Sequence, residues 1–139
     1  MTDTALKDRY TGEKFTVVHC EGAKDSFDEA MNSVEKRKHK SFTRGVIQQI
    51  ERLAKGQRMS KENFPQEGDL PKRVGQAKAK KFNALKRIPL RGYCWLSETK
   101  PHTYFISHYI YKDQKKLKSA DTERVGANWR RIEEQGDEC

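Results

Sequence analysis

The side chains best suited to chemistry in this 139-residue chain are Arg91, His108, Tyr93 and Tyr109. Residues of these types can transfer protons and can stabilise negative charge on a phosphate group. Arg91 suits phosphate because a guanidinium keeps its proton and matches the phosphate oxygens. His108 is the best base or acid by its intrinsic pKa. Tyr93 and Tyr109 could stack on a base or donate a proton.

Each of these residues also has a structural interpretation. Arg91 could form a surface ion pair, and His108, inside an apolar strand, could be a core histidine with satisfied hydrogen bonds. Core packing is the favoured interpretation for at least one of the two tyrosines. These alternatives stay open at the level of the sequence.

The spacing of cysteines and histidines predicts neither a metal site nor a cofactor. Cys20, Cys94 and Cys139 form no C-x-x-C pair, and no histidine lies three or four residues from another histidine or a cysteine. We expect reduced thiols, with Cys20 and Cys94 buried in strands.

The net charge of +9 is concentrated in one segment. Residues 1–68 hold 13 basic and 11 acidic side chains, residues 69–118 hold 13 and 3, and residues 119–139 hold 3 and 6. The basic side chains of the middle segment are Lys72, Arg73, Lys78, Lys80, Lys81, Lys86, Arg87, Arg91, Lys100, Lys112, Lys115, Lys116 and Lys118. Such a set can be a lysine-rich sheet edge, but aromatic residues interleave it, which favours a surface that binds nucleic acid.

A membrane partner is not expected. The longest apolar stretch, residues 104–111, is broken by Ser107 and His108, and a spanning helix needs roughly 20 apolar residues. The N-terminus lacks the features of a secretory signal or a transit peptide, so a cytoplasmic location is the expectation.

The first half of the chain predicts a strand and two helices. Residues 14–21 are rich in β-branched and aromatic residues. The S-x-x-E sequence from Ser26 to Glu29 predicts a capping box at the start of the first helix. The second helix should begin at Ser41 and end before Gly56, and residues 57–75 should form a long loop.

The second half predicts three strands and a helix. The strands are expected at residues 80–85, 90–96 and 103–111, and the helix after Asp121, with residues 133–139 as an acidic tail. Strict alternation along the last strand puts Tyr104, Ile106, His108 and Ile110 on one face and Phe105, Ser107, Tyr109 and Tyr111 on the other.

These elements predict an α+β fold in one domain, residues 1–139, with a flexible N-terminus at residues 1–12. The order is β-α-α-β-β-β-α, and a helical hairpin on a small, mostly antiparallel twisted sheet would bury the apolar faces.

The order of several short motifs resembles the RelE/HigB-type toxins of the RelE/ParE superfamily. The motifs are Leu53-Ala-Lys-Gly56, Phe82-Asn-Ala-Leu-Lys86, Leu90-Arg-Gly-Tyr93 and His108-Tyr-Ile-Tyr-Lys-Asp-Gln-Lys-Lys116, within residues 14–134. The loop at residues 57–75 is longer than in that family, and no catalytic tyrosine or histidine follows residue 111.

The resemblance implies a bacterial or phage type II toxin, a metal-independent mRNA endonuclease that acts at the ribosome and inhibits translation. It also implies a cognate antitoxin partner, expected to carry a helix-turn-helix domain. Arg91, His108, Lys86 and Tyr93 would be catalytic. The residues expected to contact RNA are Lys80, Lys81, Arg87, Tyr109, Lys112, Lys115 and Lys116. A ParE-like gyrase inhibitor and a nucleic-acid-binding module without enzymatic activity are the alternatives.

Overall fold

The computed structural model describes residues 6–72, 75, 77–111 and 119–136. Within them the backbone forms six strands, three α-helices, a 3-10 turn at Lys36–Lys38 and a π-helical turn at Arg130–Glu134. The strands are β1 (Arg9–Thr11), β2 (Thr16–His19), β3 (Gln66–Asp69), β4 (Lys81–Arg87), β5 (Leu90–Leu96) and β6 (Thr103–Tyr111). The helices are α1 (Ala23–Met31), α2 (His39–Lys55) and α3 (Ser119–Trp129).

All six strands belong to one sheet, in the order β1-β2-β6-β5-β4-β3. Strands β2 and β6 are parallel, and every other neighbouring pair is antiparallel. The sheet is therefore mixed but mostly antiparallel, and the predicted α+β class is confirmed.

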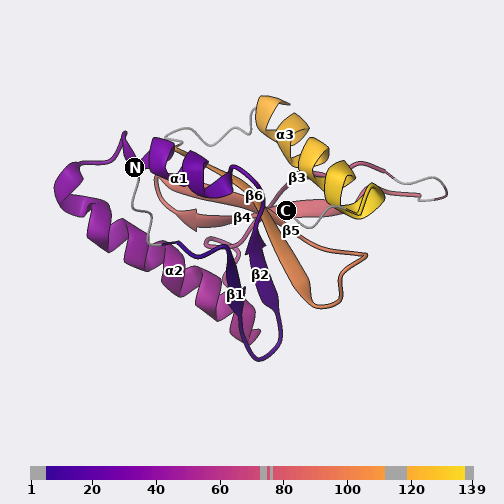
Figure 1. The fold of residues 1–139 in the computed structure, drawn as a ribbon, viewed down its shortest axis with the longest axis horizontal. Coiled ribbons are helices and arrows are strands. Elements are labelled where there is room, and N and C mark those ends of the chain that lie inside the picture. The colour runs from indigo at the N-terminus through magenta and orange to yellow at the C-terminus, as the bar shows by residue number, and fades with distance from the viewer. Residues whose placement is uncertain (1–5, 73–74, 76, 112–118, 137–139) are drawn as a thin grey trace.

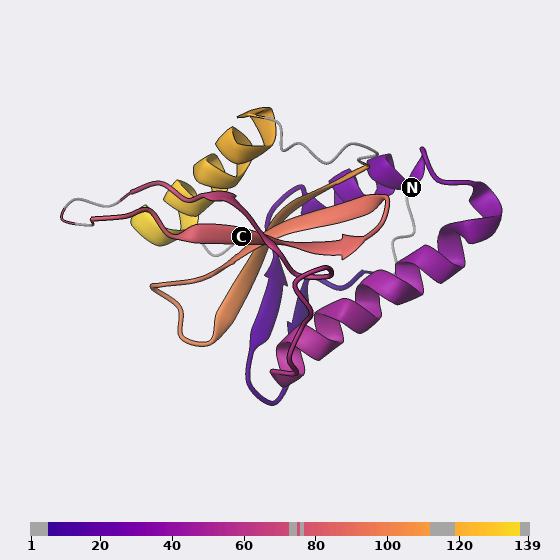
Figure 2. The ribbon, with the colours of Figure 1, turned by 180° about the vertical axis from the view of Figure 1, so that it is seen from behind.

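The helices cover both faces of the sheet. Helices α1 and α2 lie together on one side and α3 lies apart from them (Figures 1 and 2). The first core cluster joins α1 and α2 to the sheet through residues that include Phe27, Ile50, Leu85, Leu90, Cys94, Ile106 and Tyr109. The second joins α3 to the other face through Phe82, Tyr93, Trp95, Phe105, Val125, Trp129 and Ile132. Alternate residues of the central strands therefore enter different cores.

The three predicted helix boundaries of the first half have different outcomes. Helix α2 begins at His39, two residues before the predicted start at Ser41. Helix α2 ends as predicted, because Gly56 follows it with a left-handed φ of 79°. The predicted capping box is wrong, since α1 already begins at Ala23 after Gly22. Ser26 lies inside the helix, where its hydroxyl donates to the Ala23 carbonyl and accepts from the Tyr109 amide.

Two segments predicted to lack structure contain edge strands. Strand β1 lies within the expected flexible N-terminus and pairs with β2, with Tyr10 buried. Strand β3 lies within the expected long loop and pairs with β4. Pairing with a neighbouring strand, and not local sequence preference, orders these two short segments.

The strict alternation predicted for β6 is also wrong, because the strand contains a bulge at Ser107. Tyr93 pairs with His108 and Cys94 with Ile106, which leaves Ser107 as the extra residue. Phe105 and His108 consequently face α3, whereas Ile106 and Tyr109 face α1 and α2.

The predicted acidic tail begins inside the folded structure. The carboxylate of Glu133 is buried and accepts hydrogen bonds from the hydroxyl of Ser97 (2.7 Å) and the amides of Glu98 (2.6 Å) and Thr99 (3.1 Å). It thereby fixes the turn between β5 and β6 to the C-terminal end of α3. Residues 137–139 lie outside the described residues.

Of the helices that the structure describes, none combines the length and the apolar character required to cross a bilayer.

Candidate functional site

The four residues predicted to be catalytic lie on the α3 face of the sheet. Lys86 of β4 is directly opposite Arg91 of β5, and Tyr93 of β5 is directly opposite His108 of β6. Alternation along β5 places Arg91 and Tyr93 on the same face. The fold therefore brings side chains from three strands onto one face of the sheet. The pair Lys86–Arg91 and the pair Tyr93–His108 nevertheless have different surroundings.

Lys86 and Arg91 meet a carboxylate that the sequence did not suggest. One Glu67 Oε1 atom lies 3.0 Å from Arg91 Nη1 and 3.8 Å from Lys86 Nζ. Glu67 is the extra residue of a bulge in β3, between the pairs that Gln66 and Gly68 make with β4. A bulge redirects a side chain, here toward the α3 face. We call Glu67, Lys86 and Arg91 the edge cluster.

The edge cluster is only partly accessible to solvent. The exposed fractions of the side chains are 20% for Lys86, 13% for Glu67 and 5% for Arg91. The cluster contains a carboxylate that can accept a proton, an ammonium that can donate one, and a guanidinium that can stabilise negative charge. Those are the three groups that metal-free RNA cleavage requires.

His108 has the surroundings of a structural histidine. The side chain is fully buried, with Nδ1 2.8 Å from the Ser107 hydroxyl and Nε2 3.1 Å from Asp121 of α3. Asn128 of α3 donates to the same hydroxyl at 2.8 Å. These contacts assign Nε2–H as donor to Asp121 and Nδ1 as acceptor from Ser107. Burial lowers the pKa of His108, and the hydrogen bond to Asp121 opposes this shift.

Both candidate tyrosines are core residues. Tyr93 packs edge-on against Phe82 and lies beside the ring of His108, and burial raises its pKa above the ordinary value. The Tyr109 hydroxyl donates to His19 Nε2 at 2.6 Å, and its ring packs against Phe27. Burial raises the pKa of Tyr109 as well. Neither ring is placed to stack on RNA, so the predicted contact at Tyr109 is replaced by core packing.

Two lysines predicted to bind RNA form ion pairs at the surface. Lys80 Nζ lies 2.5 Å from the Glu98 carboxylate, and Lys81 pairs with Asp69 at the end of β3. The charge of the sheet is thus partly neutralised by three acidic residues, Glu67 and Asp69 of β3 and Glu98 in the turn after β5. Lys112, Lys115 and Lys116 lie outside the described residues.

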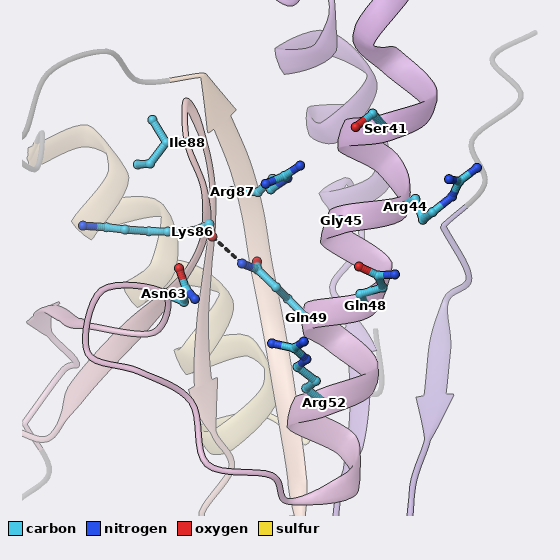
Figure 3. Close-up of a pocket in the computed structure, with 10 residues that line it drawn as sticks. All are labelled: Ser41, Arg44, Gly45, Gln48, Gln49, Arg52, Asn63, Lys86, Arg87 and Ile88. Atoms are coloured by element: carbon cyan, nitrogen blue, oxygen red, sulfur yellow. Dashed lines mark hydrogen bonds between the residues drawn. The ribbon is translucent and has the colours of Figure 1, made fainter.

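Arg87 belongs to a different basic surface, a groove of about 470 Å³ between α2 and the end of β4. Its lining residues are Ser41, Arg44, Gly45, Gln48, Gln49, Arg52, Asn63, Lys86, Arg87 and Ile88, and no carboxylate is among them. Figure 3 shows Arg52, Gln49 and Arg87 between α2 and β4, whereas the Lys86 side chain points away from α2. We call this surface the arginine groove.

The position of Arg87 depends on a glycine inside α2. A Cβ atom on Gly45 would lie 2.5 Å from Arg87 Nε and 3.0 Å from its Cδ. The missing side chain lets the guanidinium lie against the helix and over the ring of Phe42, 5.4 Å from the ring centroid. Gln49 Nε2 donates to the Lys86 carbonyl and ties the helix to β4. The groove is therefore held by specific contacts on both sides.

Sequence reasoning missed Glu67, Arg44 and Arg52. Glu67 lies in a Gln-Glu-Gly-Asp segment without strand-forming residues, so the sequence offered no signal for it. A signal for the arginines was available, because Arg44, Gln48 and Arg52 recur every four residues along α2. The small net charge of residues 1–68 concealed this stripe.

Within the described part of the chain, no group of three or more His, Cys, Asp or Glu side chains is arranged to hold a metal ion. Cys20 and Cys94 are both buried, as predicted, but only Cys94 lies in a strand, because β2 ends at His19. Cys139 lies outside the described residues.

Comparison with protein-family models, with curated proteins and with solved structures finds no match to this chain.

Proposed function

We propose that the protein is a metal-independent endoribonuclease of the RelE/HigB type, the toxin of a type II toxin–antitoxin pair that cleaves translated mRNA in the cytoplasm. The observation that carries the proposal is the edge cluster, in which one carboxylate oxygen of Glu67 lies 3.0 Å from Arg91 and 3.8 Å from Lys86. The strands and helices from β2 to α3 also keep the order on which the resemblance rests, with β1 and β3 added.

In this proposal Glu67 is the general base. Its carboxylate takes the proton of the ribose 2′-hydroxyl, and the 2′-oxygen attacks the adjacent phosphorus. The bond from phosphorus to the 5′-oxygen breaks, and the Lys86 ammonium protonates that oxygen. Arg91 stabilises the charge on the phosphoryl oxygens. The products are a 2′,3′-cyclic phosphate and a free 5′-hydroxyl, so no further reactant is needed.

His108 and Tyr93 act indirectly in this scheme. His108 joins Asp121 of α3 to the bulge of β6 and so holds the helix over the sheet beside the edge cluster. Tyr93 fills the space between Arg91 and His108 in the same layer. Both are positioning residues, since neither side chain reaches the surface.

A cleavage assay with purified protein in the presence of EDTA tests the chemistry. Wild-type protein should produce cyclic phosphate ends, and RNA with a 2′-deoxyribose at the cleaved position should stay intact. Glu67→Gln should lower the rate by about 10²–10⁴-fold, the usual contribution of a general base. Asp69→Asn, which removes a carboxylate from the same strand, should cleave like the wild type.

Mapping of transcript 5′ ends after induced expression tests the cellular role. Cuts in phase with codons support an mRNA-cleaving toxin. A DNA-damage response without such cuts would instead indicate a ParE-like gyrase inhibitor.

A nucleic-acid-binding module without enzymatic activity is the second candidate. The observation in its favour is that both cations of the edge cluster are paired with Glu67, while His108 is fully buried. In that case Glu67→Gln would bind RNA more tightly, because a competing carboxylate is removed, and the wild type would leave RNA uncut.

A further inference from the structure

We propose that the arginine groove is a second RNA site, which binds the phosphodiester backbone away from the scissile phosphate. The inference rests on the proposed function for the identity of the polyanion as single-stranded RNA. Binding in the groove can be measured separately from cleavage, because the groove contains neither Glu67 nor Arg91 and shares only Lys86 with the edge cluster.

The lining of the groove favours a polyanion. Arg44, Arg52 and Arg87 supply three permanent positive charges, and Ser41, Gln48, Gln49 and Asn63 supply polar groups. Among the described residues no carboxylate lines the groove, whereas in the edge cluster Glu67 pairs with both cations. Guanidinium groups bind phosphate oxygens through two parallel hydrogen bonds. A guanidinium that forms no ion pair within the protein can bind phosphate without first breaking one.

Arg87 is a prepared ligand of this site. Gly45 and Phe42 restrict its side chain, so little conformational freedom remains to be lost when phosphate binds. A glycine inside a helix lowers its stability by about 1 kcal/mol relative to alanine. Gly45 nevertheless lets the Arg87 side chain pack against α2.

The groove and the edge cluster are joined by consecutive residues. Lys86 directs its side chain to the α3 face, and Arg87 directs its side chain into the groove (Figure 3). Ile88, at the turn between β4 and β5, lines the groove and is 62% exposed. One RNA strand that passes over this turn would therefore place successive phosphates on opposite faces of the sheet.

The test measures affinity with a probe that cannot be cleaved, a fluorescein-labelled 2′-O-methyl oligoribonucleotide. Arg52→Met and Arg87→Met should each lower affinity by roughly tenfold, the loss of one charge-assisted contact. The slope of log affinity against log salt should decrease by about 0.7 for each lost phosphate contact. Arg37→Met is the matched control, because Arg37 is exposed and pairs with Glu35 outside the groove.

The outcomes separate this inference from the proposed function. Cleavage of a dinucleotide, too short to reach both sites, should be unchanged in Arg52→Met. Wild-type affinity in both variants would overturn the inference even if the protein cleaves RNA. If binding depends on Arg52 and Arg87 but the protein does not cleave RNA, the RNA site in the groove is supported and the proposed nuclease activity is contradicted.

Binding of inorganic phosphate or a mononucleotide as tightly as the oligonucleotide would also overturn the inference, because the groove would then be a site for a small anion. The circular dichroism of each variant must match that of the wild type at the assay temperature.

Discussion

Positive charge is handled in two different ways on the two sides of β4. At the edge cluster Lys86 and Arg91 share one carboxylate, and Arg91 is almost fully buried. The arginine groove contains Arg44, Arg52 and Arg87, and none of the described residues that line it carries a carboxylate. A buried cation needs a counter-charge to offset desolvation, whereas a cation at the surface does not. The comparison separates a place suited to proton transfer from a place suited to binding a polyanion.

The largest expected effect comes from breaking the edge cluster. Arg91→Met should destabilise the protein by about 3–5 kcal/mol, because it leaves the Glu67 carboxylate without its principal partner. The double variant Glu67→Leu/Arg91→Met should regain most of that stability, but it should not cleave RNA. Urea unfolding followed by circular dichroism measures the first effect, and the EDTA-containing cleavage assay measures the second.

If the double variant were as unstable as Arg91→Met alone, the assignment of a buried ion pair would be wrong. Retention of full toxicity by Arg91→Ala would likewise remove Arg91 from the catalytic group.

Acid should destabilise the core. RNA cleavage by the edge cluster and RNA binding by the groove can therefore be compared only at pH values where the protein stays folded. Burial lowers the pKa of His19 from 6.5 to about 4, while Nδ1 donates to the Lys7 carbonyl and Nε2 accepts from Tyr109. His19 therefore becomes protonated below pH 6.5 in the unfolded chain but only near pH 4 in the folded chain. Stability present at pH 7 should fall by about 3 kcal/mol as the pH decreases to 4.

The pKa of His108 is also lowered and acts in the same direction. Urea midpoints at pH 7 and pH 5 measure the loss, and His19→Asn should flatten it. A loss of cleavage at higher pH than the loss of structure would then belong to the edge cluster.

Gly45→Ala tests the groove without removing any charge. The new methyl group would displace Arg87 from its place against α2, so affinity for the uncleavable oligonucleotide should fall by roughly tenfold, as in Arg87→Met. The change in stability should stay within about 1 kcal/mol, because helix propensity improves while the contact with Phe42 is lost. Thr43→Ala, two residues away on the same helix, is the control and should bind normally.

The smallest effect is expected for a paired lysine at the surface. Lys80→Ala removes an exposed ion pair with Glu98 and should change stability by at most about 1 kcal/mol. Its effect on oligonucleotide affinity should be smaller than that of Arg52→Met, although each variant removes one positive charge. Equal losses in the two variants would mean that RNA responds to net charge and not to the groove.

Local patterns in the sequence were sufficient for the long elements. Helix α2 with its terminal Gly56, and strands β5 and β6, follow from periodicity and from a glycine suited to a left-handed conformation. The short edge strands were not predictable, because Gln66–Asp69 becomes a strand only through its pairing with β4.

The candidate site was predictable in its residue types but not in its partners. Arg91 and Lys86 were found from chemistry and resemblance, but the carboxylate that joins them comes from a distant segment. The roles of His108 and Tyr109 depended on which face each residue occupies. One bulge, at Ser107, decided that question, and no local pattern marks it.

The bulge at Ser107 has a consequence for any comparison between this chain and related ones. A strand of the same length without the extra residue would align with β6 without a gap, yet every position after Ser107 would be assigned to the opposite face. Substitutions at Tyr109 or Ile110 would then be interpreted against the wrong helix. Deletion of Ser107 should accordingly restore regular alternation in β6 and keep His108 and Tyr109 on the faces that they occupy now, so that it acts as a simple shortening of the strand.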